Sequence, residues 1–587
     1  MPAVEPVLMK FARKGSRLKN VWMFSHECSG IAQAGGLGEA VAGLANTLGS
    51  DYGIHVTVFL PSHGKHLDPL VRESYSLTDD PTFIAQGYRI GVNGRNYPFL
   101  SGVEKGHRGA VNYVLVKGLD SQTSRWLDDT TLYGHDLTFE KMALFSRTVK
   151  LYSEYLLSMG RVSEIPDLVH ANDWHMVPAG VATKQHLRRR GIDVPLVFTV
   201  HLLSYTALPW HYASDQWCGI QDLPQRIRLD TSKPRNLTCR QAWEVYSQDS
   251  IEKFGCLEAD YVTSVSESYL THDVIKYVGE AIQRKSGHIY NGCDWDSDAI
   301  TARVLTETGD DTKNAERSPA PARWELRKSL LTQGIAQAAN DGQGIVEPFK
   351  NDGPLVLMTG RLSPQKGADV LLNAVPRVTK ALPTTKFLLF LLYSGDDFQK
   401  NTIEKQASAY PNNVRLIFGK HPEPYLMAHV AADVYAMPSR SEPFGISALE
   451  AMVTGNPVVG SNIGGIRETV LDIRSHGESG TGLLIPAEDP KALADSLISL
   501  LIVMRINELA QREEPEPASL SEKIPVEHLG QLASREPRLG SKIRDNCRNR
   551  VIKNFRWKNA GAMALKRYGA AVQLVDASPR VRKGRRG

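Results

Sequence analysis

Two carboxylates, Glu442 and Glu450, are spaced so that both could contact one long ligand. If all the steps between them were helical, they would lie about 12 Å apart at about 1.5 Å per residue. The acid/base pair of a glycosidase needs about 5–9.5 Å between its carboxyl groups. The spacing therefore predicts two separate ligand contacts and argues against one catalytic couple.

The turn between these carboxylates predicts an anion site. A buried strand predicted over residues 433–437 leads towards Pro443 and Gly445, which shape the backbone because proline fixes φ and glycine frees it. A helix predicted over residues 446–453 follows directly. Its N-terminus, near Gly445 and Ile446, offers unpaired N–H groups and a positive dipole end that suit a phosphate.

A second strand-to-helix loop carries two cations. Arg361 and Lys366 follow an apolar strand predicted over residues 355–360. Two positive side chains in this position can clamp a diphosphate and stabilise the negative charge of a leaving group. The glycine-rich loop at 33–39 follows the first predicted strand, at 20–24, and its adjacent glycines let a ligand approach the backbone closely.

Histidines end two other predicted strands of the first half. His175 closes a polar, aromatic turn that also contains Asp173, and His201 ends the strand predicted over residues 195–201. Ligands of α/β sheets bind at the C-terminal ends of parallel strands, so these side chains are candidates for a site. A single histidine in such a turn is usually a hydrogen-bonded structural residue, and the residues alone leave both interpretations open.

The elements that must hold these loops alternate between strand and helix in both halves of the chain. Such alternation predicts an α/β fold with doubly wound sheets. The stretch 61–117 looks irregular apart from strand-like segments at 88–92 and 111–116, and apolar periodicity predicts a core helix over 138–159. Further strands are predicted at 54–60, 167–175 with its polar turn, 259–266, 386–393, 414–418 and 458–459.

Length, charge and cysteine content bound the class of protein. The chain has 587 residues, which predicts two or more domains. Lys and Arg outnumber Asp and Glu by 69 to 64, and much of this small excess lies near the two ends, which favours solvated tails over a nucleic-acid partner. Six scattered cysteines without a C-x-x-C pair indicate reduced thiols in a cytoplasmic protein, and no metal site is predicted. The longest apolar runs are too short to span a bilayer, and the N-terminus shows no signal region.

The predicted organisation is two α/β domains with less regular segments around them. The charged insertion in the second domain is expected to be exposed and flexible, because it has little apolar periodicity. In chain order the segments are a basic extension at 1–19, an N-terminal Rossmann-like domain at 20–300, a linker or insertion at 301–352, a C-terminal Rossmann-like domain at 353–556 with the insertion at about 507–540, a last helix at 557–575 and a basic tail at 576–587.

Together these motifs resemble the glycogen and starch synthases, which are retaining glycosyltransferases with the GT-B fold (glycosyltransferase family 5, close to the group 1 transferases of family 4). The resemblance covers roughly residues 21–574, apart from the two insertions. Two positions depart from the family: Gln33 stands where a lysine near the donor phosphates is usual, and residues 202–205 lack the usual asparagine. The matching segments are E-x7-E at 442–450 with its P-F-G turn, G-R-L-x-x-Q-K-G at 360–367, H-A-N-D-W-H at 170–175, F-T-x-H at 198–201, N-G-x-D at 291–294 and F-x-W at 555–557.

The resemblance implies two Rossmann-like doubly wound domains facing across a cleft, with residues 557–575 crossing back to the first domain. It implies a hexosyltransferase that moves glucose from ADP-glucose or UDP-glucose to the non-reducing end of an α-1,4-glucan with retention of configuration, as in glycogen biosynthesis. The nucleotide-sugar is a substrate, so no cofactor is expected. A membrane span is not expected either, and a homo-oligomer is left open.

The resemblance also distributes roles among the candidate residues. Because Gln33 can form hydrogen bonds but lacks the lysine charge, it predicts weaker diphosphate binding by the glycine-rich loop. The catalytic set is His175, Arg361, Lys366 and Glu442. Contacts with the nucleotide-sugar fall to Gln33, Gly35, Gly36, Leu37, Gly445, Ile446 and Glu450, and the residues near the sugar or acceptor are Asp173, His201 and Asn291.

Three other functions stay open at this point. A retaining GT-B enzyme with a small sugar or a lipid as acceptor would share every donor residue. A non-catalytic glycan-binding homologue is the interpretation that Gln33 favours, although Arg361, Lys366, Glu442 and Glu450 are all present. A glycan phosphorylase would need pyridoxal phosphate, for which the sequence shows no convincing lysine site.

Overall fold

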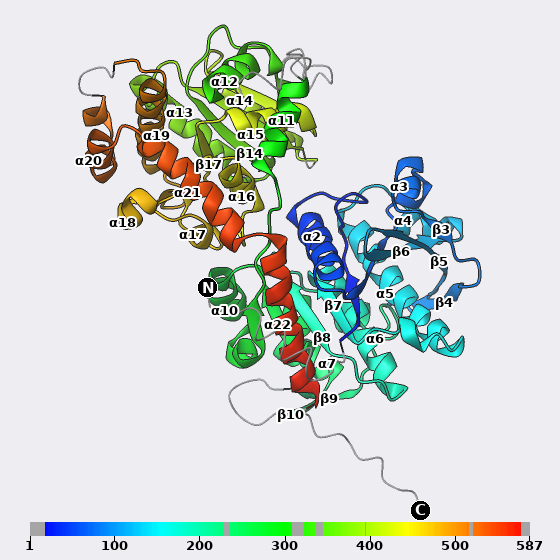
Figure 1. Ribbon diagram of the computed structural model, residues 1–587. Helices are drawn as coiled ribbons and strands as arrows, with labels where there is room; N and C mark the ends of the chain where they lie inside the picture. Colours follow the sequence, from blue (N-terminus) through cyan, green and yellow to red (C-terminus); the bar gives the residue numbers. More distant parts are fainter. Residues whose placement is uncertain are drawn as a thin grey trace, which may run out of the picture. The chain divides into compact units, whose positions relative to one another are not determined.

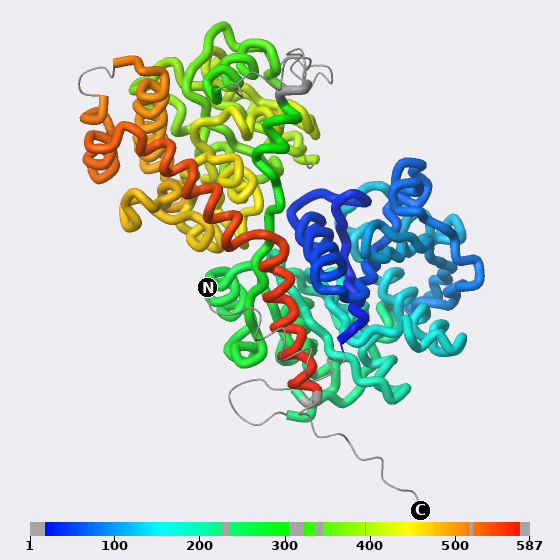
Figure 2. The backbone as a smooth tube through the Cα atoms, viewed as in Figure 1, coloured from blue at the N-terminus to red at the C-terminus, as the bar shows by residue number. Residues whose placement is uncertain are grey.

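The computed structural model describes residues 18–227, 235–307, 322–335, 344–393, 395–515 and 520–576. The chain divides into two compact units: unit 1 consists of residues 1–292 and 557–587, and unit 2 of residues 293–556. Figure 2 shows the two stretches of unit 1 at the blue-to-green and the red parts of the colour scale. Nearly all of the two predicted basic tails lie outside the described residues, as do parts of the predicted linker and insertion.

Unit 1 is built on a large, mainly parallel sheet (Figure 1). Among the described residues the strand order is β12-β11-β8-β7-β1-β2-β6-β5-β3, with β4 paired to β5. The strands from β12 to β6 are parallel, and β5 runs antiparallel to β3, β4 and β6. The strands are β1 Asn20–Phe24, β2 His55–Pro61, β3 Thr78–Asp79, β4 Ala85–Ile90, β5 Asn96–Arg108, β6 Val111–Gly118, β7 Leu168–Asn172, β8 Leu196–Val200, β11 Tyr261–Ser264 and β12 Ser286–His288.

The strand order places a switch point between β1 and β7. The chain winds from β1 through β2 to β6 on one side, and from β7 through β8 to β11 on the other. At such a point the loops after the two central strands diverge and leave a crevice at their carboxyl ends. The loops after β1 and β7 carry the predicted glycine-rich segment and His175, so the topology brings two distant motifs to one edge of the sheet.

The prediction for residues 61–117 was correct only in part. The strand-like segments expected at 88–92 and 111–116 overlap β4 and β6, but β5, which is 13 residues long, was missed. Charged side chains interrupt its apolar pattern, but the structure pairs them: Glu104 Oε1 lies 3.0 Å from Lys117 Nζ and Glu104 also contacts Arg72. Because these charges are neutralised by residues outside the strand, the alternation that would reveal it is hidden in the sequence.

Helices pack against the sheet of unit 1, and the last of them, α22, also packs against the first, α2. Helix α22 contacts α2 at Gly43, where an added Cβ would lie 2.1 Å from the Trp557 ring. A second contact joins α22 to the sheet, because His170 Nδ1 lies 2.8 Å from the Tyr568 hydroxyl. The described α-helices of five or more residues in this unit are α2 Gly36–Ser50, α3 Pro69–Ser74, α4 Ser121–Leu127, α5 His135–Ser158, α6 Val177–Arg189, α8 Ile251–Glu258 and α22 Trp557–Asp576.

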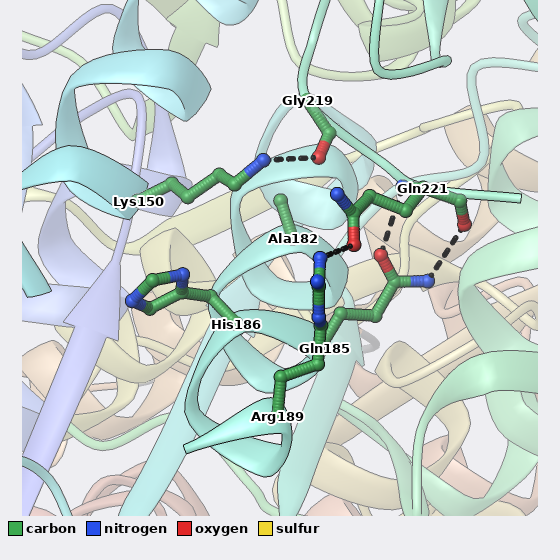
Figure 3. A pocket seen from close by; sticks show the side chains of 7 residues that line it. All are labelled: Lys150, Ala182, Gln185, His186, Arg189, Gly219 and Gln221. Carbon is green, nitrogen blue, oxygen red and sulfur yellow. Dashed lines mark hydrogen bonds between the residues drawn. The ribbon is translucent and has the colours of Figure 1, made fainter. Parts of the chain in front are cut away.

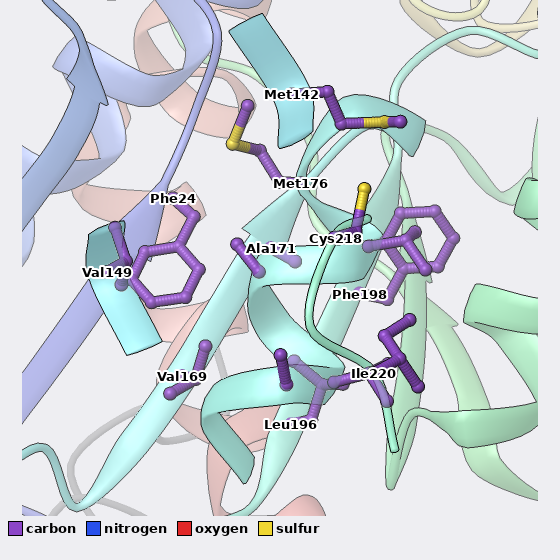
Figure 4. Packing of buried hydrophobic residues seen from close by; sticks show 14 of the residues in the cluster. Phe24, Met142, Val149, Val169, Ala171, Met176, Leu196, Phe198, Cys218 and Ile220 are labelled. Carbon is purple, nitrogen blue, oxygen red and sulfur yellow. The ribbon is translucent and has the colours of Figure 1, made fainter. Parts of the chain in front are cut away.

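Apolar side chains from β1, β7, β8 and α5 form the core of unit 1 (Figure 4). Phe24 packs edge-on against Phe145 with ring centroids 6.0 Å apart, and both side chains are fully buried. Trp217, which lies in the aromatic segment after β8, is also buried and stacks with Arg89 at 4.4 Å. That tryptophan is therefore part of the packing of the unit.

Unit 2 contains a second, almost entirely parallel sheet. Its order among the described residues is β13-β16-β15-β14-β17-β18-β19, and only β13 is antiparallel to its neighbour. Counted from β14, this is the 3-2-1-4-5-6 order of a doubly wound nucleotide-binding sheet, with its switch point between β14 and β17. The strands are β13 Gly344–Ile345, β14 Leu355–Arg361, β15 Lys386–Leu392, β16 Val414–Phe418, β17 Val434–Met437, β18 Val458–Ser461 and β19 Gly482–Ile485.

The helices of unit 2 confirm the predicted α16 with its bounds at both ends. The last helix predicted at 557–575 corresponds to α22, and α21 ends just before it, at Asn554. The described helices of eight or more residues are α11 Ser297–Glu307, α12 Arg323–Thr332, α13 Ala368–Ala381, α14 Asp397–Ser408, α15 Pro422–Ala431, α16 Ile446–Val453, α19 Pro490–Gln511, α20 Glu527–Arg535 and α21 Leu539–Asn554.

The segment 301–352, predicted as a linker or insertion, contributes α12 to the core of unit 2. Leu330 of α12 is fully buried, and Arg327 is buried beside three carboxylates. Its guanidinium lies 2.9 Å from Asp433 and 3.1 Å from both Asp352 and Glu508. The sequence signal of this helix is weak because a buried arginine occupies its inner face.

The segment 507–540, predicted to be a flexible insertion, instead contains helical structure. Helix α19 continues to Gln511, and α20 is a short helix that docks with Leu529 and Ala533 buried. The Val526 N–H donates to Ser499 Oγ at 3.0 Å, which anchors the start of α20 on α19. Leu529, Leu532 and Ala533 of α20 do have helical spacing, but this short stretch stands among charged residues and prolines, which led to the prediction of a flexible insertion.

We therefore expect Leu529→Ala to destabilise unit 2. Truncating a fully buried leucine costs about 2–4 kcal/mol through lost transfer energy and the cavity left behind. The matched control is Gln531→Ala, which is exposed on the same helix. Urea unfolding measures both variants, and equal midpoints would show that α20 is a detached insertion after all.

Candidate functional site

Unit 2 brings Arg361, Lys366 and Glu442 together at its switch point. Arg361 is the last residue of β14, Lys366 ends the short turn Pro364–Lys366, and Glu442 lies in the loop between β17 and α16. Lys366 Nζ lies 2.5 Å from Glu442 Oε2, and Ser439 Oγ donates to the same oxygen at 3.4 Å. The carboxylate is buried and the ammonium is half-buried, so this is a strong, partly desolvated ion pair.

Arg361 completes the cationic group. Its side chain is half-buried, and within the described part of the chain its guanidinium has no hydrogen bond or ion pair. A guanidinium carries five donors in a planar fork that matches phosphate oxygens. Next to the Lys366–Glu442 pair, it leaves one unneutralised positive charge for an anionic ligand.

Arg440 ties together the loops that carry these groups. Its N–H donates to the Gln365 carbonyl at 2.7 Å, and its guanidinium donates to the Pro364 carbonyl at 2.7 Å. The guanidinium also makes a two-pronged contact with Asp369 at 2.7 and 2.9 Å and a contact with Glu488 at 2.7 Å. Three loops at the carboxyl edge of the sheet are therefore fixed by one side chain that sequence reasoning missed.

Glycines let the Glu442 loop pack without side chains. Gly445 has φ +96°, a conformation that favours glycine, and it caps the N-terminus of α16. Gly464 has φ +40°, and an added Cβ there would lie 2.0 Å from the Glu442 carbonyl oxygen. The Gly465 N–H donates to the same carbonyl at 3.1 Å. The backbone N–H groups at Gly445 and Ile446 thus lie where the sequence predicted an anion site.

Glu450 lies one step further along α16 and contacts a different side chain. The Tyr425 hydroxyl donates to Glu450 Oε2 at 2.9 Å. Burial and the nearby Glu450 carboxylate raise the pKa of Tyr425 well above its ordinary value, so the hydroxyl stays a donor. Because α16 begins only at Ile446, the predicted separation of Glu442 and Glu450 rested on a wrong assumption of continuous helix between them.

In unit 1, a buried carboxylate holds the glycine-rich loop. Glu27 Oε2 accepts the Ala34 N–H at 2.7 Å and the Gly35 N–H at 2.9 Å, and the Tyr133 hydroxyl donates to its other oxygen. Helix α2 then starts at Gly36, inside the predicted glycine-rich loop at 33–39. Sequence reasoning missed Glu27, whose only signal is its place just after the first strand.

Gln33 points back into its own loop. Its amide donates to the Gly35 carbonyl at 3.2 Å, and its side chain is half-buried. Gly36 is exposed and Leu37 is buried, so the loop presents backbone rather than apolar side chains at Gly35 and Gly36. The loop therefore has the glycines that the sequence predicts but no positive charge of its own at this position.

His175 lies in a cluster of uncharged aromatic side chains. Its ring stacks on His26 with centroids 4.8 Å apart and on Trp174 at 4.0 Å, and Tyr133 lies 5.6 Å away. Burial holds the pKa of His175 well below its ordinary value and lowers that of His26 to about 4. Both rings are therefore neutral at physiological pH, and the cluster offers polar but uncharged groups.

Asp173 and His201 lie beside this cluster. Asp173 Oδ1 accepts the His201 N–H at 2.7 Å and the Leu202 N–H at 3.2 Å, and Asp173 has the unusual φ of +61°. His201 Nε2 lies 3.0 Å from Asn172 Oδ1. Burial raises the pKa of Asp173 to about 7 and lowers that of His201 to about 3. Asn291 is buried near the end of unit 1, next to Gly292, which packs against Trp557.

The loop that departs from the family pattern at 202–205 is held by Glu252. Glu252 Oε1 accepts the N–H groups of Ser204 and Tyr205 at 2.6 and 3.0 Å. Tyr205 has φ +56° and is 62% exposed. A buried acid thus fixes this loop although the usual asparagine is missing.

Two cavities lie elsewhere. One of about 20 Å³, enough for a single water, is lined by Lys150, Gln185 and Gln221 in unit 1 (Figure 3). The other, of about 390 Å³, is lined by Arg327, Asp433 and other residues at the amino ends of β14 and β17, opposite the edge that carries Arg361. None of the predicted site residues lines either cavity.

The described residues form neither a metal-binding cluster nor a membrane-spanning helix. In the described part of the chain, no group of three or more His, Cys, Asp and Glu side chains is arranged to hold a metal ion. Among the same residues, no helix combines the length and the apolar composition that crossing a bilayer would require.

Comparison with known families matches both units. The family model of the starch synthase catalytic domain matches residues 20–283, and that of the group 1 glycosyl transferases matches residues 345–512. In both units the chain is therefore similar to the glycogen and starch synthases. Its two doubly wound units are the GT-B fold of this family.

Individual relatives of this synthase family are distant. The glycogen synthase of Geotalea daltonii is 28% identical over 345 residues, which cover 57% of this chain and 63% of that protein. The glycogen synthase of Exiguobacterium sibiricum is 24% identical over 494 residues, which cover 81% of this chain and 90% of that protein. The first match therefore spans less than two thirds of the relative.

A solved structure supports the fold. The catalytic domain of starch synthase IV from Arabidopsis thaliana, bound to ADP and acarbose, superposes with a TM-score of 0.64 at 19% identity and covers 95% of this chain and 99% of that one. At this identity the likeness shows only the architecture. The roles of individual residues in the present chain rest on the geometry of the present chain.

We expect Arg440→Met to weaken nucleoside diphosphate binding by at least tenfold. The loss of its contacts would free the Lys366 and Glu442 loops from each other, and Arg440→Lys should recover only part of the affinity because an ammonium lacks the fork. The control is Arg377→Met, which removes an arginine–aspartate pair on α13 away from these loops. Calorimetric titration with ADP and UDP measures the effect, and equal affinities in the Arg440 and Arg377 variants would refute it.

We also expect unit 1 to lose stability as the pH falls from 7 to 5. Seven of its described histidines have pKa values lowered by burial, so below about pH 6.5 the unfolded chain binds protons that the folded chain does not. Raised pKa values at Asp173, Glu252 and Glu258 act in the opposite direction over the same range, but they are fewer. The histidines are His26, His63, His66, His170, His175, His186 and His201.

Tryptophan fluorescence can follow this transition, since all tryptophans except Trp295 and Trp324 belong to unit 1. The urea midpoint should be lower at pH 5 than at pH 7. A midpoint that is unchanged or higher at pH 5 would mean that the carboxyl groups dominate.

Proposed function

We propose that the chain is a retaining glucosyltransferase that transfers glucose from ADP-glucose or UDP-glucose to the non-reducing end of an α-1,4-glucan. The observation that carries this proposal is the cationic group of unit 2. Arg361, Lys366 and the start of α16 all lie at the switch point between β14 and β17, where a doubly wound sheet binds nucleotides. The similarity to glycogen synthases supports the same reaction.

The leaving group explains why charge is concentrated in unit 2. When the bond between sugar C1 and the diphosphate oxygen breaks, the diphosphate gains negative charge. Arg361 and Lys366 would stabilise that charge, together with the N–H groups at Gly445 and Ile446. Lys366 is held by Glu442 in the ligand-free structure, so it would exchange part of this contact for the diphosphate.

The polar groups of unit 1 suit an uncharged sugar. His175 and His26 are neutral, and the resemblance assigns His175 to the reacting sugar. The acceptor hydroxyl oxygen would bond to C1 on the face that the diphosphate leaves, and its proton would pass to the departing diphosphate oxygen. This sequence gives retention of configuration with every bond and proton accounted for.

Gln33 supports a second candidate, a glycan-binding homologue that does not turn over a nucleotide-sugar. Its amide donates to the Gly35 carbonyl within its own loop, and it brings no charge to a diphosphate. Incubation with ADP-glucose and UDP-glucose side by side, with glycogen or short maltooligosaccharides as acceptor, separates the two. Elongated glucan supports the enzyme, whereas glycan binding without transfer from either donor supports the homologue.

We expect Glu442→Ala and Lys366→Ala to reduce glucose transfer by at least 100-fold while the fold is kept. Lys366→Ala removes a cation and leaves the Glu442 carboxylate uncompensated beside the diphosphate, whereas Glu442→Ala removes the contact that positions Lys366. Lys405→Ala, an exposed lysine on α14, is the control and should keep its activity. Radiolabelled transfer to glycogen measures the rates, and an undiminished rate in either site variant would contradict the assignment.

Gln33→Lys should strengthen donor binding several-fold. A lysine restores the positive charge that the family usually places in this loop, whereas Gln33→Met changes the shape without adding charge. The KM for the preferred nucleotide-sugar should fall only in the lysine variant. Equal KM values in both variants would show that the loop does not contact the diphosphate.

A further inference from the structure

A lysine is buried in the core of unit 1, beside the histidine cluster. Lys141 lies in the second turn of α5, and its side chain is 0% exposed. Its ammonium makes three hydrogen bonds, at 2.8 Å to His63 Nδ1 and at 2.7 Å to the carbonyls of Asp129 and Thr131. All three donors of the ammonium are used, and none of these acceptors is a carboxylate.

Such a group is costly unless its geometry is needed. An ammonium removed from water loses its hydration, and neutral acceptors compensate for this loss only in part. Burial lowers the pKa of Lys141 to about 8, although Asp129 and Asp128 lie near enough to oppose the shift. An apolar side chain would fill the same space on α5 without this cost.

The contacts of Lys141 lead to the candidate site by two routes. One passes through the segment 129–133: the Leu132 carbonyl accepts from His26 Nε2 at 2.8 Å, and the Tyr133 hydroxyl donates to Glu27. Glu27 in turn holds the glycine-rich loop. The other route passes through His63, whose Nε2 lies 2.9 Å from the His26 carbonyl oxygen.

The ammonium also decides which ring nitrogens carry protons. Because an ammonium can only donate, His63 Nδ1 must accept, and the proton of His63 lies on Nε2, where it is donated to the His26 carbonyl. His26 faces the Leu132 carbonyl with Nε2, so its Nδ1 carries no proton. That nitrogen is buried without a partner among the described residues, and so is His175 Nδ1.

We propose that Lys141 is a positioning residue of the transfer site: it fixes the segment 129–133 and His63, and through them it sets the orientation of His26, Tyr133 and Glu27 around His175 and the glycine-rich loop. This inference rests on the proposed glucosyl transfer for its effect on activity. Its structural part, the tautomer of His26, does not depend on that reaction.

The chain offers a matched control within the same unit. Lys285 also donates to two backbone carbonyls, those of Leu257 and Ala259, and burial lowers its pKa to about 8. Its contacts lie near β11 and do not reach the histidine cluster. Removal of either ammonium should have a similar effect on stability, but only Lys141 should affect transfer.

The first test is a double-mutant cycle of Lys141→Met and Tyr133→Phe, measured as kcat/KM for glucose transfer in the full chain. Lys141→Met should reduce kcat/KM at least tenfold, Lys285→Met less than threefold, and the double variant should be little worse than Lys141→Met alone. Additive losses, or equal losses in the Lys141 and Lys285 variants, would overturn the proposal. If Lys141→Met does not fold, Lys141→Gln replaces it in the same cycle.

The second test needs no turnover. Nitrogen-15 NMR of labelled histidines, with His26 assigned by a His26→Gln variant, should show the proton of His26 on Nε2 in the wild-type chain, where the Leu132 carbonyl accepts it, and a mixture of tautomers in the Lys141 variant, where the segment 129–133 is no longer held. An unchanged His26 tautomer would overturn the proposal even in an inactive protein. Wild-type chain without transfer but with the expected tautomers would refute the proposed function and leave the role of Lys141 in the fold established.

Discussion

The ion pair between Lys366 and Glu442 is the contact on which the candidate site depends. It joins the loops that follow β14 and β17, which are adjacent in space but separated by more than seventy residues of sequence. Without a carboxylate, the positive charges of Arg361 and Lys366 would repel each other and loosen the loops that carry them. A buried carboxylate offsets one of the two charges, and Arg361 keeps the other available.

This arrangement is possible only because the backbone approaches itself closely. Gly367 has φ +72°, and an added Cβ would lie 2.1 Å from the Pro438 carbonyl oxygen. Gly464 lies equally close to the Glu442 carbonyl. The two units differ in what they present: unit 2 has positive charge and helix N–H groups at its switch point, whereas unit 1 has buried histidines with lowered pKa values.

The strands, helices and loops that carry the site motifs could be predicted from the sequence because each motif is local. The strand before each motif, the glycines and the side chains with chemistry lie within about ten residues of one another, so β16, α16 and the loops at Arg361 and Glu442 could be found without a structure. What the sequence concealed are the residues that hold these motifs from a distance. Glu27, Lys141 and Arg440 act through contacts with other loops, and no periodicity marks them.

Long-range pairing also explains the errors in the fold prediction. Strand β5 contains charges that are neutralised by α3 and β6, and α12 has a buried arginine whose carboxylate partners come from three other places in the chain. In both cases the polar residues look exposed when only the local sequence is considered. Helix α20 is short and stands among charged residues and prolines, so its surroundings outweighed the helical spacing of its apolar residues.

The central claim is that unit 2 recognises a diphosphate through Arg361 and Lys366. The most direct measurement compares the affinity of the wild-type chain and of the Arg361→Ala/Lys366→Ala double variant for ADP and adenosine, and for UDP and uridine, by calorimetry. We expect the wild-type chain to bind one of the diphosphates at least 100-fold more tightly than the corresponding nucleoside. The double variant should lose this preference. A preference for the diphosphate that survives in the double variant would contradict the claim.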